Sequence, residues 1–266
     1  MFSAFLTGFE RVASSAPDSD ERPCRWDGVM ADATRMENRL LDLLPDGERT
    51  DLMSMMDRGT ITPHDVLQAA GQPMRKVHFP MSGVISLMTP LADGTAIETA
   101  TIGNEGMVGV HAFLGGGVLN NAMAMSQVPG EMLSLGIDTF RAFVEGDGKM
   151  RDIMMAYTQA LFVQIAQAVA CNGVHEIQQR AAKWFLETHD RVEGDEFLLT
   201  QEFLADMLGV TRPSVSVAAG TLQAAGLITY RRGQVIILDR PGLEEASCEC
   251  YAVVRSEYEK LLSPAS

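Results

Sequence analysis

The sequence has few cysteines and no long uninterrupted apolar segment. Four cysteines in 266 residues are too few for the disulfide framework of a small secreted protein. No apolar run approaches the roughly 20 residues needed to span a bilayer. The opening residues also lack the charged and continuous apolar regions of a secretory signal. We therefore expect a cytoplasmic protein with reduced thiols and no membrane partner.

Positive charge is scarce as well. The 21 Lys and Arg residues stand against 35 Asp and Glu, which gives a formal net charge of -14. Such a chain has no overall attraction for nucleic acid, so any DNA binding requires a local concentration of positive charge.

Enzyme motifs are missing too. The sequence contains no HExxH, GxSxG or GxxxxGK[ST] pattern. The His-x-His pair of metal-binding cupin barrels is absent, because His78 and His111 are each followed by apolar residues. We therefore predict neither catalysis nor a metal site.

The length and the changing apolar period predict two domains of α+β class. Short apolar runs separated by glycine-rich turns favour an N-terminal antiparallel β-roll, or double-stranded β-helix. A long central helix and a C-terminal winged helix-turn-helix follow. The predicted segments are a poorly ordered extension (1–35), the β-roll (36–145), the helix (146–174), the winged domain (175–240) and a C-terminal helix or tail (241–266).

The central helix is apolar nearly all round, and no Pro or Gly interrupts it from Lys149 to Asn172. Such a helix must be buried on two sides. We expect one side to pack on the β-roll and the other on a second copy of the chain. The alternative is a core helix in a monomer. The predicted dimer residues follow alternating spacings of four and three: Met150, Met154, Tyr157, Leu161, Gln164 and Ala168.

Two adjacent short helices carry the strongest local signals. Thr200 is a good N-cap for the first helix, and Gly209 supplies a left-handed residue to end it. Thr211 then caps a second helix that has Pro213 in its first turn, where a missing N–H costs little. Alternating strands at 227–230 and 235–238 follow, which predicts a winged helix-turn-helix.

This segment also supplies the local charge that DNA binding requires. Residues 207–238 contain three arginines and no Asp or Glu. On the second helix we expect Arg212 to reach guanine, and the neighbouring hydroxyls to reach phosphate or base edges. On the wing we expect contacts with the DNA backbone. These candidates are Thr211, Arg212, Ser214 and Ser216 on the helix, and Tyr230, Arg231, Arg232 and Gln234 on the wing.

From about Met36 to the C-terminus the order of elements resembles the Crp/Fnr family of bacterial transcription regulators. The specific matches are LTQEFLADMLGVTRPSVSVAAGTLQAAGLI and the following RRGQVIILDRPGLE. The resemblance implies a β-roll of the cyclic-nucleotide-binding type, a homodimer along the long helix, and a near-palindromic promoter site with half-sites ~34 Å apart. It also implies RNA polymerase as a partner if the protein is an activator.

The resemblance carries over to individual DNA-reading positions only in part. The family arginine that reads guanine matches Arg212, and the phosphate-side positions match Thr211 and Arg180. A base-reading position that is commonly glutamate is Pro213 here. A later polar reader falls on Val217, which can pack on a thymine methyl. The family's recognition sequence is therefore not transferable.

The sensor pocket departs further from the family. Its nucleotide-binding Gly-Glu-Leu and Arg-Ser/Thr-Ala segments correspond to 106–108 and 120–122, where the arginine is missing. Without that anion contact we do not expect a cyclic nucleotide. The cysteines and histidines are not grouped in sequence as iron-sulfur or haem ligands, so we predict no cofactor, and Cys248 and Cys250 are interpreted as small residues on a terminal helix. The candidate effector pocket is Glu105, Gly106, Met107, Asn120 and Asn121.

We therefore predict a homodimeric DNA-binding transcription regulator. The alternative is a β-roll sensor that regulates a protein partner and has a vestigial helix-turn-helix, because residues 217–220 are poor in polar side chains. The sequence also leaves open whether an effector exists.

Overall fold

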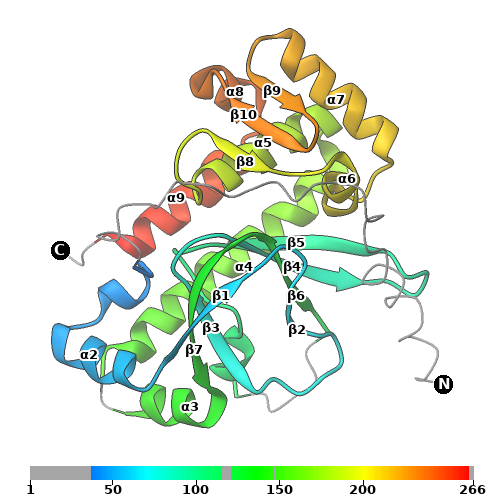
Figure 1. Cartoon of the computed structure of the whole chain (residues 1–266). Helices are drawn as coiled ribbons and strands as arrows, with labels where there is room; N and C mark the ends of the chain where they lie inside the picture. Colours follow the sequence, from blue (N-terminus) through cyan, green and yellow to red (C-terminus); the bar gives the residue numbers. More distant parts are fainter. Residues whose placement is uncertain (1–36, 116–120, 147, 264–266) are drawn as a thin grey trace.

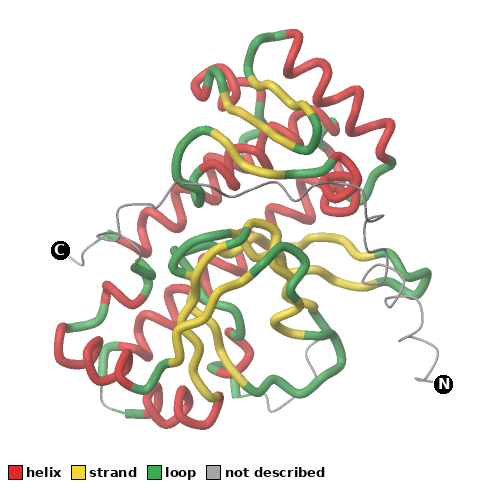
Figure 2. Tube along the Cα trace, viewed as in Figure 1, coloured by secondary structure: helices red, strands yellow, loops and turns green. Residues whose placement is uncertain are grey.

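The computed structural model describes residues 37–115, 121–146 and 148–263. Strands dominate the first part of the chain, and helices around three short strands dominate the second (Figures 1 and 2). The predicted α+β class, with its roll, long helix and winged helix-turn-helix, is confirmed. The predicted extension at residues 1–35, which includes Cys24, lies outside the described residues.

The elements follow one another in the order of the labels in Figure 1. The first part contains η1 (Leu41–Leu43), α2 (Asp46–Ser54), β1 (Asp57–Ile61), β2 (Val66–Gln68), β3 (Lys76–Pro80), β4 (Val84–Pro90), β5 (Ala96–Ile102), η2 (Val110–Ala112), β6 (Met123–Val128), β7 (Gly130–Gly136), α3 (Ile137–Glu145) and α4 (Met150–Val174). The second part contains α5 (Ile177–His189), β8 (Glu196–Leu198), α6 (Gln201–Leu208), α7 (Arg212–Ala224), β9 (Ile228–Arg231), β10 (Gln234–Ile237), α8 (Arg240–Ala246) and α9 (Cys250–Leu262).

Two antiparallel sheets form the roll, with strand orders β1-β7-β3 and β2-β6-β4-β5. Fully buried side chains such as Phe79 and Ile85 fill the space between them. The turn before β4 depends on Gly83, whose φ is +81°. A Cβ at Gly83 would lie 2.6 Å from the carbonyl oxygen of Val128, so only glycine fits this corner.

Helix α4 covers the roll with the face that we predicted to form the dimer. The hydroxyl of Tyr157 donates to the carbonyl oxygen of Met107 (2.7 Å), and the amide of Gln164 donates to that of Thr101 (3.1 Å). The predicted assignment of this face to a dimer is therefore wrong. Five of its six residues are at most 3% exposed and the sixth, Ala168, is half-buried: Met150, Met154, Tyr157, Leu161, Gln164 and Ala168.

Helix α9 lies along α4, where the Tyr258 hydroxyl donates to Oε1 of Gln164 at 2.8 Å. By length and composition alone α4 also passes the test for a membrane-spanning helix. The core helices of soluble proteins often have this length and composition, and α4 packs on the roll and on α9 with part of its surface.

The second core belongs to the C-terminal domain, where α5, α6 and α7 pack around the sheet β8-β10-β9. Met88, Met123 and Met125 of the roll also join this core. The C-terminal domain is therefore packed directly on the four-stranded sheet of the roll.

Candidate DNA-binding interface

The helix-turn-helix forms where the local signals place it. The side chain of Thr200 accepts a hydrogen bond from the backbone N–H of Phe203 (3.1 Å) and caps α6. Gly209 ends α6 with a φ of +62°. Thr211 then precedes α7, which has proline in its first turn. The turn between the two helices is short, so α7 begins at a fixed angle beside α6.

The wing is a tight hairpin in which β9 and β10 are joined by Arg232 and Gly233. Both linking residues have positive φ, +52° and +76°, as a two-residue hairpin of this kind requires. β8 extends the hairpin to a three-stranded antiparallel sheet. The side chain of Arg232 is therefore displayed at the tip of a rigid turn.

Three arginines are exposed on α7 and the wing: Arg212, Arg231 and Arg232. Among the described residues none of them has an ion-pair partner. Val217, one turn further along α7 than Pro213, is 72% exposed. These side chains are thus free to meet a ligand on the outer side of the domain, where α7 lies in Figure 1.

The polar candidates are exposed or half-buried and lie near one another. Thr211 and Ser214 share a hydrogen bond between their hydroxyl oxygens at 2.9 Å. The hydroxyl of Ser216 donates to Oε1 of Gln201 at 2.6 Å, which ties α7 to the first turn of α6. Gln234 donates to the carboxylate of Glu196 on β8. Thr211 and Ser214 thus lie together at the start of α7, Ser216 contacts the start of α6, and Gln234 lies on the wing.

Two predicted contacts are buried instead, and both predictions need correction. Arg180 is 8% exposed and donates to the carbonyl oxygen of Leu208, at the end of α6. Tyr230 is 6% exposed, and its ring packs edge-on against Phe185 at 6.1 Å. Burial raises the pKa of Tyr230. Arg180 holds α5 against α6, and Tyr230 fills the core beneath the wing.

Three residues of the predicted effector pocket, Glu105, Gly106 and Met107, are instead buried in the protein's own packing. Glu105 makes an ion pair with Arg191 at 2.7 Å, and both side chains are less than 10% exposed. Met107 is fully buried, and a Cβ at Gly106 would lie 2.8 Å from the Tyr157 ring. Asn121 is exposed, and Asn120 lies outside the described residues. Glu105 therefore joins the roll to the C-terminal domain.

Sequence reasoning did not single out Glu98, which lies in the same junction. Its carboxylate accepts hydrogen bonds from the indole N–H of Trp184 (3.1 Å) and the amide of Gln127 (2.6 Å), and from the hydroxyl of Ser86. Burial raises the pKa of Glu98 to about 7, and the negative charge of Glu187 acts in the same direction. The positive charge of Lys183 partly opposes this rise.

We expect Glu98 to make stability depend on pH. Its pKa rises from 4.5 to about 7 on folding, so the folded state binds the proton more tightly. Stability should therefore fall as the pH rises from 4.5 to 7 and level off above 7. Glu98→Gln removes this ionisation. The change that it makes in the free energy of unfolding should be more favourable at pH 8 than at pH 4.5 by about 2–3 kcal/mol.

Urea unfolding of the wild type and Glu98→Gln at pH 4.5 and pH 8, at one protein concentration, measures this difference. The exposed Glu145→Gln serves as the control and should follow the wild type. Among the described residues the Gln127 Oε1 atom has no hydrogen-bond partner. Rotation of that amide would therefore offer an acceptor to the amide group that Glu98→Gln introduces. Parallel pH profiles for wild type and Glu98→Gln would contradict the assignment.

The periodicity of α4 concealed a second apolar stripe on the side away from the roll. Met155, Phe162 and Val169 are 58%, 71% and 69% exposed. Gln159 and Ala166 lie between them and Gly173 follows Val169, at spacings of four and three, and all three are exposed. This is the pattern of a helix-to-helix seam. The exposed stripe is therefore the residues Met155, Gln159, Phe162, Ala166, Val169 and Gly173.

Cys248 and Cys250, which the sequence suggested are small residues on a terminal helix, lie just before α9 and at its first residue. Together with Cys171 they form a buried cluster between the end of α4 and the start of α9. His175 joins them. The only sequence signals were Cys-x3-His at the end of one helix and Cys-x-Cys at the start of another.

Two family models match the sequence over much of these two domains. Residues 58–147 match the cyclic nucleotide-binding domain, and residues 179–246 match the Crp-like helix-turn-helix domain. Together the two matches cover more than half of the chain. No curated protein matches the sequence significantly.

Solved structures of several bacterial regulators share the fold. FixK2 from Bradyrhizobium japonicum aligns with a TM-score of 0.62 and 18% identity, over 73% of this chain and 98% of that one. The c-di-GMP responsive global regulator CLP from Xanthomonas campestris gives 0.58 and 13%, over 73% and 99%. A CRP/FNR-family transcriptional regulator from Thermus thermophilus gives 0.58 and 16%, over 72% and 98%.

A cyclic-nucleotide-binding-type roll, followed by a long helix and a Crp-like helix-turn-helix, defines a class of two-domain transcription regulators. This chain belongs to the Crp/Fnr family of that class.

Proposed function

We propose that the protein regulates transcription by binding promoter DNA as a homodimer. The observation that carries the proposal is the group of exposed arginines on α7 and the wing, within a segment that has no acidic residue. In an otherwise acidic chain, this surface meets the requirement for local positive charge at phosphates. The beginning of α7 enters the major groove in this interpretation.

Each α7 contributes one base reader and several positioning groups. Arg212 is exposed in the first turn and presents two parallel donors, which match O6 and N7 of guanine. Thr211, Ser214 and Ser216 donate to phosphate or to base edges, and Val217 packs on a thymine methyl. Arg231 and Arg232 contact the DNA backbone from the wing, with Gln234 beside them.

The homodimer forms through the exposed stripe of α4. A two-fold axis places the same stripe of both copies in contact, so the dimer needs no second, different surface. Small residues at Ala166 and Gly173 allow the helices to approach, while Phe162 fills the centre. Pairing α4 in this way buries the large apolar side chains that the monomer leaves in water.

A signal that reaches the roll acts by changing the packing between the domains. The hydrogen bond between Glu98 and Trp184 joins the roll to α5, and the Glu105–Arg191 ion pair joins it to the segment just after α5. A ligand or a pH change at this junction changes the orientation of the two helix-turn-helix domains only if it stabilises one arrangement of the domains more than another. A dimer that is always competent to bind, and is controlled by its own abundance, needs no such signal.

Selection of bound sequences from random duplex DNA tests the proposal directly. The purified full chain is used at two salt concentrations without added ligand. We expect a two-fold-symmetric motif whose half-sites lie ~34 Å apart. Salt-sensitive binding without sequence preference would contradict specific reading by the unliganded dimer. Unchanged regulation after replacement of Arg212, Arg231 and Arg232 by Ala would favour the protein-partner alternative.

A further inference from the structure

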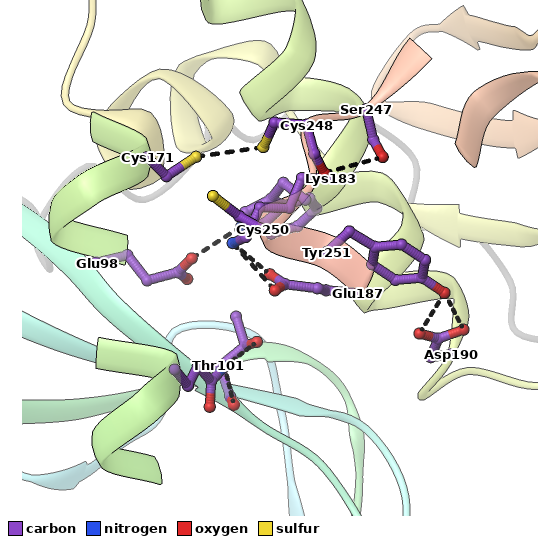
Figure 3. Close-up of polar contacts among 12 residues, drawn as sticks. Glu98, Thr101, Cys171, Lys183, Glu187, Asp190, Ser247, Cys248, Cys250 and Tyr251 are labelled. Atoms are coloured by element: carbon purple, nitrogen blue, oxygen red, sulfur yellow. Dashed lines mark hydrogen bonds and ion pairs between the residues drawn. The ribbon is translucent and has the colours of Figure 1, made fainter. Parts of the chain in front are cut away.

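The four residues of the cysteine cluster come from two segments that are far apart in the sequence. Cys171 lies in the last turn of α4, and His175, four residues later, is the residue that ends it. Cys248 and Cys250 lie at the start of α9, after the C-terminal domain has been completed. Figure 3 shows the three sulfur atoms pointing toward one another.

The distances within the cluster match ligands of a single ion. Sγ of Cys171 and Sγ of Cys248 are 3.5 Å apart, and Sγ of Cys250 lies 3.6 Å from Nδ1 of His175. All four donor atoms lie within 4.8 Å of one another. Zinc bonds of about 2.3 Å to sulfur and about 2.0 Å to nitrogen, at tetrahedral angles, separate ligand atoms by about 3.5–3.8 Å.

The surroundings of the cluster are also those of a metal site. Nε2 of His175 lies 3.1 Å from the carboxylate of Glu249, which leaves Nδ1 facing the sulfurs. A carboxylate on the outer nitrogen fixes the ring and makes the inner nitrogen a better ligand. Arg180 and Lys183 of α5 place positive charge beside the thiols.

This positive charge suits the net charge of a loaded site. Three thiolates around a divalent ion leave one negative charge, which Arg180 can offset, whereas Lys183 also pairs with Glu187 at 3.0 Å. Metals bind the thiolate form of cysteine, and nearby positive charge favours that form.

A simple pair of buried thiols does not account for this arrangement. Buried cysteines that only fill space need no histidine, and no carboxylate behind it. An iron-sulfur cluster holds its ligand sulfurs further apart than one shared ion does, because several iron atoms lie between them. Three thiolates and one imidazole in tetrahedral array are a common set for structural zinc.

We propose that the chain binds one Zn²⁺ ion through four ligands: Cys171, His175, Cys248 and Cys250. Binding displaces one proton from each of the three thiols to solvent, and the imidazole binds in its neutral form. The site lies at the joint between α4 and α5, where the roll ends and the C-terminal domain begins. Zinc therefore ties the segment after α8 to the end of α4 and holds the joint at one angle.

The test begins with the full-length protein purified under reducing conditions. Elemental analysis should find one zinc per chain. After removal of zinc with a chelator, added Co²⁺ should give the visible absorption of tetrahedral cobalt and a near-ultraviolet thiolate-to-metal band. Less than about a tenth of an equivalent of zinc together with no such cobalt bands would overturn the proposal. A disulfide between Cys171 and Cys248 in this protein would overturn it as well.

Variants identify the ligands. Cys248→Ser should lose the metal, while Cys24→Ser, at the one cysteine of the sequence that is not among the four proposed ligands, should keep it. His175→Cys keeps four ligands and should retain cobalt with a shifted spectrum, so it distinguishes loss of a ligand from loss of folding. Retention of a full equivalent of metal by both Cys248→Ser and Cys250→Ser would overturn the proposal.

Discussion

Arg212→Ala should abolish specific DNA binding while leaving the protein folded and its oligomeric state unchanged. The side chain is exposed in the first turn of α7 and has no ion-pair partner among the described residues. A bidentate contact with guanine contributes about 1–3 kcal/mol to each half-site. Two half-sites together predict a loss of roughly 30-fold to 10⁴-fold in affinity for the selected site.

Fluorescence anisotropy with the selected duplex measures this loss, in parallel with a scrambled duplex. Arg75→Ala is the matched control, because Arg75 is an exposed arginine of the roll and its removal changes the net charge equally. Arg231→Ala should differ from both variants. It should lower the affinity for the selected and the scrambled duplex equally and reduce the salt dependence of binding. If Arg212→Ala lowered the affinity for both duplexes equally, Arg212 would be a phosphate contact and not a base reader.

Phe162→Glu should convert the protein to monomers. Phe162 is 71% exposed in the middle of the apolar stripe of α4, so the substitution does not disturb the chain's own core. In a two-fold dimer both introduced carboxylates would lie near the axis, without partners and without water. Burying such charges costs about 3–5 kcal/mol, which weakens dimerisation roughly a hundred- to five-thousand-fold.

Sedimentation velocity over a range of concentrations measures the dimerisation constant. Leu91→Glu adds the same charge at an exposed apolar residue just after β4, away from the stripe, and should leave the dimer intact. DNA affinity should fall with Phe162→Glu as well, because a monomer binds one half-site. A stable dimer of Phe162→Glu would show that another surface joins the two copies.

The helix-turn-helix could be predicted from the sequence because its signals are local. A capping threonine, a left-handed glycine and a proline in the first turn each act within a few residues, and Gly209 indeed ends α6. The exposure of Arg212 follows from the same local helix. The burial of Arg180 and Tyr230 does not, because it depends on α6 and on the core beneath the wing, which are distant in the sequence.

The face of α4 was predicted wrongly for a related reason. Both sides of the helix carry apolar residues at spacings of three and four, and periodicity does not say which side meets the chain's own roll. Tyr157 and Gln164 identify the side that meets the roll, because the Tyr157 hydroxyl and the Gln164 amide donate to carbonyl oxygens of the roll. The cysteine cluster was not predicted because 77 residues separate Cys171 from Cys248 in the sequence.

The hydrogen bond between Trp184 and Glu98 gives the protein an internal optical probe. The indole is 3% exposed, and it lies where the roll meets the C-terminal domain. Separation of the domains would move the ring from a dry, polar contact into water and shift its emission to longer wavelength. The chain has one other tryptophan, Trp26. In the variant Trp26→Phe, the emission wavelength of Trp184 therefore reports separation of the two domains without an attached dye.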